Sequence, residues 1–200
     1  MQTPGSNVDE LLRAAIEQSV KPPDTGQLQA IDLPLDDDIH ATWDPAKLAG
    51  AIADLGYPRF CQLSGESKKN PAIILLAALG TDDLEVRIIE ALPWLAVRYY
   101  NLDWDWLLDR VKQRHAQNRL GFIVTLGRRI AGKHENQRAS SRLRQIEEAL
   151  RPARLACEDT LCQASLSDAE RRWLRNSRPE DAQYWNLLTD LDSEQLSYGV

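Results

Sequence analysis

The chain offers few side chains that could perform catalysis. Its three histidines, His40, His115 and His134, are far apart, and His115 continues the apolar face of a predicted helix. The phosphate-loop, dinucleotide-binding, nucleophile-elbow and HExxH zinc-protease motifs do not occur in the sequence. We therefore predict no catalytic residue, no metal site and no cofactor, and we expect that the protein is not an enzyme.

Two acidic groups come closest to a metal or acid–base site. Residues 36–38 are three consecutive aspartates, and ligands from three successive residues rarely converge on one ion. Asp103, Asp105 and Asp109 fall on a predicted helix, where the first caps the helix and the other two face solvent. Capping and solvation explain both groups. An enzyme whose site combines scattered acids with His115 stays a further alternative.

Large aromatic side chains are concentrated between residues 90 and 106. Trp106 lies away from the apolar stripe of its own helix, and tryptophan and tyrosine are preferred anchors at protein interfaces. Packing in the core is the commoner use of such residues and stays the alternative. The residues that we predict to bind a partner are Trp94, Tyr99, Tyr100, Trp106 and Arg110.

Positive charge is concentrated in residues 110–154. This stretch holds twelve Lys/Arg and three acids, a net charge of +9. Because the whole chain has a net charge of −6, the remaining residues carry −15. The asymmetry could serve an acidic partner, a basic partner, or attraction between two parts of the chain itself. If the partner is a nucleic acid, the predicted phosphate contacts are Arg128, Arg129, Lys133, Arg138, Arg142 and Arg144.

Composition places the chain among ordinary globular proteins. Two hundred residues with 43% apolar content can bury one sizeable core. The longest apolar run, Ala72–Leu79, is far shorter than the roughly 20 residues of a membrane-spanning helix. Cys61, Cys157 and Cys162 are odd in number and fit neither a disulfide framework nor a zinc site. We expect free thiols, a cytoplasmic location and no membrane contact.

Helix signals dominate, and the predicted fold is all-α, an orthogonal bundle of about eight to ten helices. A capping box predicts a first helix from Asn7 to about Val20, and a loop rich in Pro and Asp spans 21–42. We expect three parts: this N-terminal helix with its loop (1–42), a helical domain (43–192) and a flexible tail (193–200).

Cap residues mark most of the helix starts in the domain. Asp44-Pro45 and Asn70-Pro71 open helices that end at Gly56 and Gly80, and the second is apolar on all sides. A further helix is expected from Asp83 to Leu92, where Pro93 kinks it or begins another. Asp103 caps the next helix, and Ser167 with Glu170 forms a second capping box.

The later helices are predicted from apolar spacing. After a turn near Gln117-Asn118, residues 119–132 form a central helix whose Gly121 and Gly127 let a neighbouring backbone approach. An apolar seam then runs from Leu143 to Cys157, with a bend at Pro152. The closing helices are expected to place large side chains on apolar faces: Trp173, Leu174, Tyr184, Trp185, Leu187, Leu188 and Leu191.

Residues 102–131 resemble the C-terminal domain of AbiEi-type antitoxins, the regulator half of bacterial toxin–antitoxin and abortive-infection systems. The matching elements are Leu102-Asp103 before a helix and Arg119-Leu120-Gly121-Phe122 at the start of the next. The resemblance implies that the protein is not an enzyme. It would regulate a toxin as its partner and would itself bind promoter DNA. Residues 1–60 carry no strand pair for the winged helix of that family.

Taken together, the sequence favours a bacterial-type interaction or regulatory protein that binds a protein partner through aromatic and basic helix surfaces. The first alternative is a nucleic-acid-binding regulator that uses the basic region 110–154. The oligomeric state does not follow from the sequence.

Overall fold

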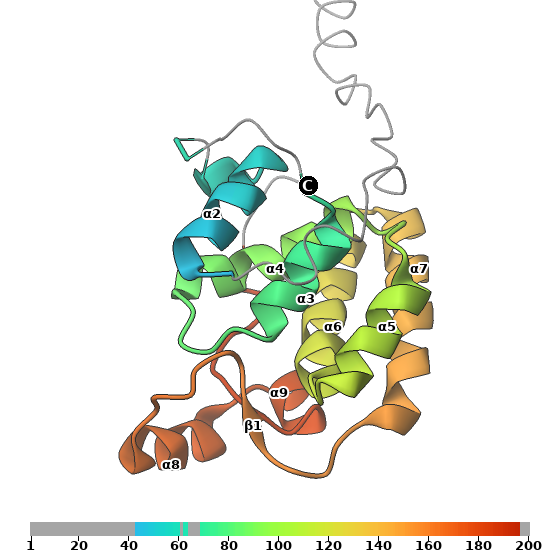
Figure 1. The fold of residues 1–200 in the computed structure, drawn as a ribbon. Coiled ribbons are helices and arrows are strands. Elements are labelled where there is room, and N and C mark those ends of the chain that lie inside the picture. Colours follow the sequence, from blue (N-terminus) through green and yellow to red (C-terminus); the bar gives the residue numbers. More distant parts are fainter. Residues whose placement is uncertain (1–42, 61, 64–68, 197–200) are drawn as a thin grey trace, which may run out of the picture.

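A computed structural model describes residues 43–60, 62–63 and 69–196 (Figure 1). The all-α prediction is confirmed, and the described residues add one small sheet of two short strands. No described helix is both long enough and apolar enough to cross a membrane. The predicted helix Asn7–Val20 and the loop 21–42 lie outside the described residues. The elements are α2 (Pro45–Asp54), η2 (Pro58–Phe60, 3₁₀), α3 (Pro71–Leu79), α4 (Val86–Arg98), α5 (Trp104–Gln113), α6 (Gln117–Lys133), α7 (Gln137–Leu150), η3 (Arg151–Ala153, 3₁₀), β1 (Asp159–Thr160), α8 (Asp168–Ser177), α9 (Glu180–Tyr184) and β2 (Leu187–Leu188).

The first two described helices begin at the predicted caps. The Asp44 side chain accepts a hydrogen bond from the Lys47 amide at 2.8 Å, and the Asn70 side chain accepts one from the Ala72 amide at 2.9 Å. All nine residues of α3 are buried, because the helix has no polar face to turn outward. It is therefore a central element of the core, as its sequence predicted.

Helix α4 differs from its prediction at its start. It begins at Val86 instead of Asp83, because Asp83 takes a left-handed conformation (φ 53°) that ends any helix. The Asp83 carboxylate instead accepts hydrogen bonds from the amide and hydroxyl of Ser165 at 2.9 and 2.8 Å. Pro93 lies within α4, which continues to Arg98.

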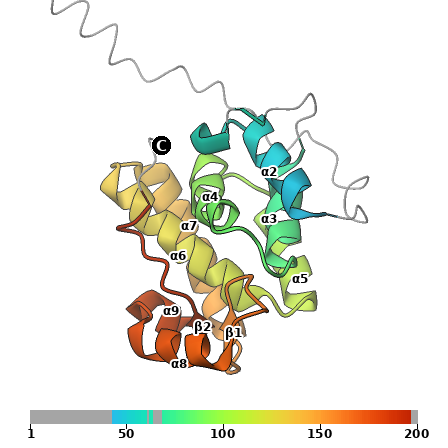
Figure 2. The same ribbon diagram turned by 90° about the vertical axis from the view of Figure 1, so that its left-hand side faces the viewer.

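Helix α6 runs through the middle of the molecule, with α7 packed along it (Figure 2). The predicted turn near Gln117-Asn118 was placed too late, since α6 already starts at Gln117. The chain reverses two residues before α6 begins, at His115, which has φ 56° and is exposed. The prediction that His115 continues the apolar face of α5 was therefore wrong.

Two glycines allow close packing on α6, each in a different way. A Cβ at Gly127 would lie 3.2 Å from the Pro93 carbonyl oxygen, so the α4 backbone approaches there as predicted. At Gly121 the neighbour is a side chain: a Cβ would lie 2.4 Å from the Trp185 ring. The Trp185 Nε1 donates to Thr125 Oγ1 at 2.9 Å, and this indole is fully buried.

The predicted seam from Leu143 to Cys157 ends early. Leu143, Ile146 and Leu150 are buried, but α7 stops at Leu150 and a 3₁₀ turn containing Pro152 follows. Cys157 is exposed and lies beyond that turn. The proline ends the helix, where the prediction had only a bend.

The C-terminal elements gather at the lower end of the molecule in both views (Figures 1 and 2). Strands β1 and β2 pair in parallel, with Asp159 opposite Leu187 and Thr160 opposite Leu188. Leu187 and Leu188 thus belong to a strand, where the prediction had a helix. In the predicted flexible tail (193–200), Ser193 and Leu196 are buried. Residues 197–200 lie outside the described part of the chain.

Candidate interaction surfaces

Two of the predicted partner-binding residues belong to the core. Trp94 is 3% exposed and its ring lies 5.1 Å from that of Tyr57. Tyr99 is 8% exposed and its hydroxyl donates to the Leu55 carbonyl at 3.0 Å. Burial raises the pKa of the Tyr99 phenol. The prediction that Trp94 and Tyr99 anchor a partner is therefore corrected, because neither ring is accessible on the folded chain.

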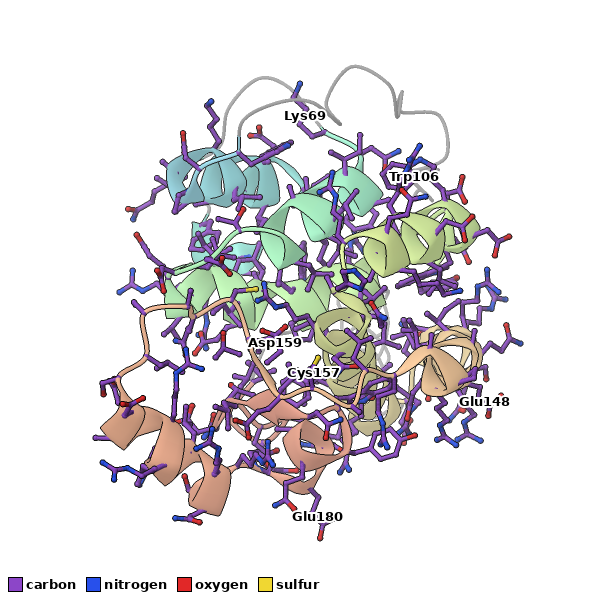
Figure 3. The ribbon with its side chains drawn as sticks, turned by 60° about the horizontal axis from the view of Figure 1, so that its bottom comes forward. Lys69, Trp106, Glu148, Cys157, Asp159 and Glu180 are labelled. Carbon is purple, nitrogen blue, oxygen red and sulfur yellow. The ribbon has the colours of Figure 1, made fainter. Side chains whose placement is uncertain are left out.

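The other three predicted residues keep part of their surface. Tyr100 and Trp106 are half-buried and pack against the edge of the core. Trp106 and Arg110 are one turn apart on the same flank of α5, and the Arg110 guanidinium donates to Gln113 Oε1 at 3.2 Å. Trp106 lies at the outer side of the molecule in Figure 3. A partner could contact this flank, although much of the indole already touches its own chain.

The basic residues of α6 are paired within the chain. Their partners come from α7, from α9 and from the turn that follows β2, and each contact is short. Arg128 Nε lies 2.6 Å from Glu147, Arg129 Nη2 lies 2.7 Å from Asp181, and Lys133 Nζ lies 2.6 Å from Glu194. Of the three explanations for the charge asymmetry, these contacts favour electrostatic attraction between parts of the chain itself over an acidic or a basic partner. They argue against Arg128, Arg129 and Lys133 as nucleic-acid contacts.

The predicted basic residues on α7 behave differently. Arg138 and Arg144 are exposed, and Arg142 is half-buried. Within the described part of the chain, none of the three has a carboxylate partner. Among the described residues, the only side-chain hydrogen bond of these three arginines joins Arg142 Nη1 to Gln145 Oε1 at 3.2 Å. The six predicted nucleic-acid contacts thus separate into a neutralised set on α6 and an unneutralised set on α7.

One exposed aromatic residue was assigned wrongly from the sequence. Trp173 was expected on an apolar face, yet it is 57% exposed, while its neighbour Leu174 is the one buried residue of α8. Adjacent helical residues point about 100° apart, so both cannot face the core. Three of the four residues three and four positions from Trp173 are polar (Glu170, Asn176 and Ser177), and this was the available signal for exposure.

Tyr184 is a second exposed aromatic ring that was expected on an apolar face. Its ring is 42% exposed, and the Arg154 guanidinium lies over it, 4.6 Å from the ring centre. Arg154 Nη1 also donates to the Tyr184 carbonyl at 2.7 Å. The ring therefore has a cation–π partner within the chain.

The most elaborate polar cluster joins α6 to the C-terminal elements. Arg119 donates from Nε and Nη2 to the two Asp159 carboxylate oxygens at 2.8 and 3.0 Å, and from Nη1 to the Leu79 carbonyl at 2.9 Å. Burial lowers the pKa of Arg119, but the hydrogen bonds and charge of Asp159 outweigh it and raise the pKa. Nearby, burial raises the pKa of the Cys162 thiol to about 12. Because the guanidinium is fully engaged, the cluster is a structural cross-link.

The candidate acid–base and metal-binding residues lie partly outside the described part of the chain. His115 and His134 are exposed, and His40 and residues 36–38 lie outside the described residues. Within residues 43–60, 62–63 and 69–196, no group of His, Cys, Asp and Glu is arranged to hold a metal ion.

Comparisons with protein-family models, curated proteins and solved structures found no match to this chain.

Proposed function

We propose that this protein is a non-enzymatic binding protein that recognises a protein partner, with Trp173 of α8 as its anchor. The observation that carries the proposal is the exposure of this indole, 57%, on a helix that buries only Leu174. Large side chains of this kind dominate binding energy at protein interfaces, because a partner pocket removes their apolar area from water.

The anchor is held on a rigid support. The Ser167 side chain accepts from the Glu170 amide at 3.3 Å, and the Glu170 carboxylate accepts from the Ser167 amide at 2.8 Å. Arg175 holds Glu158 through Nε at 2.9 Å and Nη2 at 2.7 Å, which ties α8 to the segment before β1. A pre-positioned side chain loses little freedom on binding, and this favours affinity.

The half-buried flank formed by Tyr100, Trp106 and Arg110 is a second, weaker contact in this proposal. The resemblance of residues 102–131 to AbiEi-type antitoxins supplies its most specific form, in which the partner is a toxin and the protein is a bacterial regulator acting in the cytoplasm. A partner encoded next to this gene, in particular a nucleotidyltransferase-like protein, is the first to test.

The test compares the wild-type chain with Trp173→Ala by calorimetric titration against the co-purified partner. We expect the Kd to rise by roughly 30-fold or more, the usual effect of truncating an interface anchor. The matched control is Leu63→Ala, which removes another large exposed apolar side chain (53% exposed) far along the chain from α8. An unchanged Kd for Trp173→Ala, with unchanged thermal unfolding, would refute the proposal.

A further inference from the structure

The outward surface of α7 is polar, basic and free of acids over most of its length. No Asp or Glu occurs from Gln137 to Ile146. Its exposed residues in this stretch are Gln137, Arg138, Ser141, Arg144 and Gln145. The helix lies at the outer edge of the molecule in Figure 1, in agreement with the exposure of these residues.

Two arginines flank the buried ridge of this helix. Leu143 is 0% exposed and faces the core, and Arg142 and Arg144 are its immediate neighbours in the chain. Each residue of an α-helix advances by about 100°, so these two arginines project to opposite flanks. Arg138 and Gln145 lie on the outer ridge between the flanks.

The pairing pattern distinguishes these arginines from the other basic residues nearby. Arg128, Arg129 and Lys133 of α6 each contact a carboxylate within 2.7 Å. Arg142 and Arg144 contact no carboxylate of the described residues, although Glu147 lies one turn further along the same helix and is bound by Arg128 and Arg151. Glu147 is thus used by other arginines, and neither Arg142 nor Arg144 forms an ion pair with the exposed Glu148 or with another described carboxylate.

We propose that α7 binds double-stranded DNA by entering the major groove. A helix with its side chains is about 10–12 Å wide and the major groove is about 12 Å wide, so the two flanks meet the two phosphate backbones. Arg142 contacts phosphates on one wall and Arg144 on the other. A single acidic polypeptide strand would contact one flank only, so the two-sided arrangement favours a groove.

The positions of nearby acidic residues limit which part of α7 can enter the DNA major groove. Glu148 lies near the C-terminal end of the helix and is exposed, and Figure 3 places it on the outer side of α7. Its carboxylate would be repelled by phosphate, as would that of the exposed Glu135 two residues before α7, so the middle of the helix, from Arg138 to Gln145, meets the groove. Arg138 and Gln145 on the ridge then face base edges, for which Arg suits guanine and Gln suits adenine.

The experiment measures fluorescence anisotropy of a labelled duplex of about two helical turns with the full-length chain, between about 50 and 200 mM salt. Each phosphate contact contributes about 0.9 to the slope of log K against log salt. We expect Arg142→Ala and Arg144→Ala each to reduce the slope by about 0.9 and to weaken binding about eightfold at 0.1 M salt. Arg142→Lys and Arg144→Lys, which keep the charge, should retain the slope.

The control is Arg87→Ala, since Arg87 is an exposed arginine at the start of α4 and should leave binding unchanged. An effect of only one of the two α7 substitutions, or no binding by the wild-type chain, would overturn the proposal. So would equally tight binding of polyglutamate that depends equally on both arginines, because this would assign the surface to acidic polypeptides. Trp173→Ala should leave DNA binding intact, which separates this test from that of the proposed function.

Discussion

At the scale of single residues, Gly121 is the described glycine at which an added side chain would meet the closest neighbour, the ring of Trp185. The Trp185 ring occupies the space that a side chain at position 121 would need, only 2.4 Å from an added Cβ. We predict that Gly121→Ala lowers the free energy of unfolding by about 1–3 kcal/mol, because the indole or the helix must move. Urea unfolding followed by circular dichroism measures this.

The control for this prediction is a second glycine of the same helix. At Gly132, near the end of α6, an added Cβ meets nothing within 4 Å. Gly132→Ala should therefore stabilise the protein by about 0.5–1 kcal/mol, through helix propensity alone. A similar loss of stability in both variants would contradict the packing explanation.

Trp104 and Trp106 provide a second comparison at this scale. Trp104 is 1% exposed and its Nε1 donates to the Tyr100 carbonyl at 2.8 Å, so Trp104→Ala should cost about 3–5 kcal/mol. Trp106 is half-buried and makes no such hydrogen bond among the described residues, so Trp106→Ala should cost less than half as much. Chemical unfolding of both variants tests this, and equal losses would place Trp106 in the core.

At the scale of elements, local signals predicted the helix starts that depend on neighbours in sequence. Asp44, Asn70, Asp103 and Ser167 all cap the helices that they were expected to cap. A cap requires only a side chain and an amide two or three residues away, so the sequence contains the whole interaction.

Elements that depend on distant partners were missed. Asp83 leaves the helix because it binds Ser165, 82 residues later, and β1 exists only because it pairs with β2. The same reason applies to the candidate sites. Trp94 and Tyr99 were assigned to a surface because nothing local distinguishes a core aromatic residue from an exposed one. Which basic residues are neutralised depends on acids up to 61 positions away, as for Lys133 and Glu194.

The attachment of α8 should depend on pH. Hydrogen bonds from Arg175, followed by the charges of Arg175 and Arg178, hold the pKa of Glu158 below its usual value. A carboxyl whose folded-state pKa is depressed stabilises the protein above its unfolded-state pKa of about 4.5, and this contribution is lost as the pH falls through the folded-state value. We predict loss of stability below about pH 4.5.

Two variants identify the source of this pH dependence. Arg175→Gln should make the fall in urea midpoint between about pH 6 and pH 3 less steep, because Glu158 loses the hydrogen bonds that lower its pKa most. Arg172→Gln, on the same helix, should keep the wild-type slope, since its guanidinium Nε donates to the Asp168 carbonyl instead of a carboxylate. An identical slope in all three proteins would contradict the role of Glu158.

At the scale of the whole molecule, buried cross-links join the C-terminal elements to the helical core. Cys162 lies at this junction, its thiol 3.4 Å from the Ala78 carbonyl and its pKa raised to about 12 by burial. We predict that iodoacetamide at about pH 8 modifies the exposed Cys157 but spares Cys162 until the protein unfolds. Peptide mass mapping with and without urea measures both sites, and equal labelling in the native protein would show that the junction opens.

The indole of Trp185 also has a consequence for how the chain folds during synthesis. Its hydrogen-bond partner Thr125 precedes it by 60 residues. At a translation rate of 5–20 residues per second, Trp185 is synthesised about 3–12 seconds after Thr125, and only then can its ring pack over Gly121. During this interval the surface of α6 at Gly121 is not yet covered by the Trp185 ring, and a chaperone can bind there. A chain truncated before position 185 would leave this surface uncovered permanently.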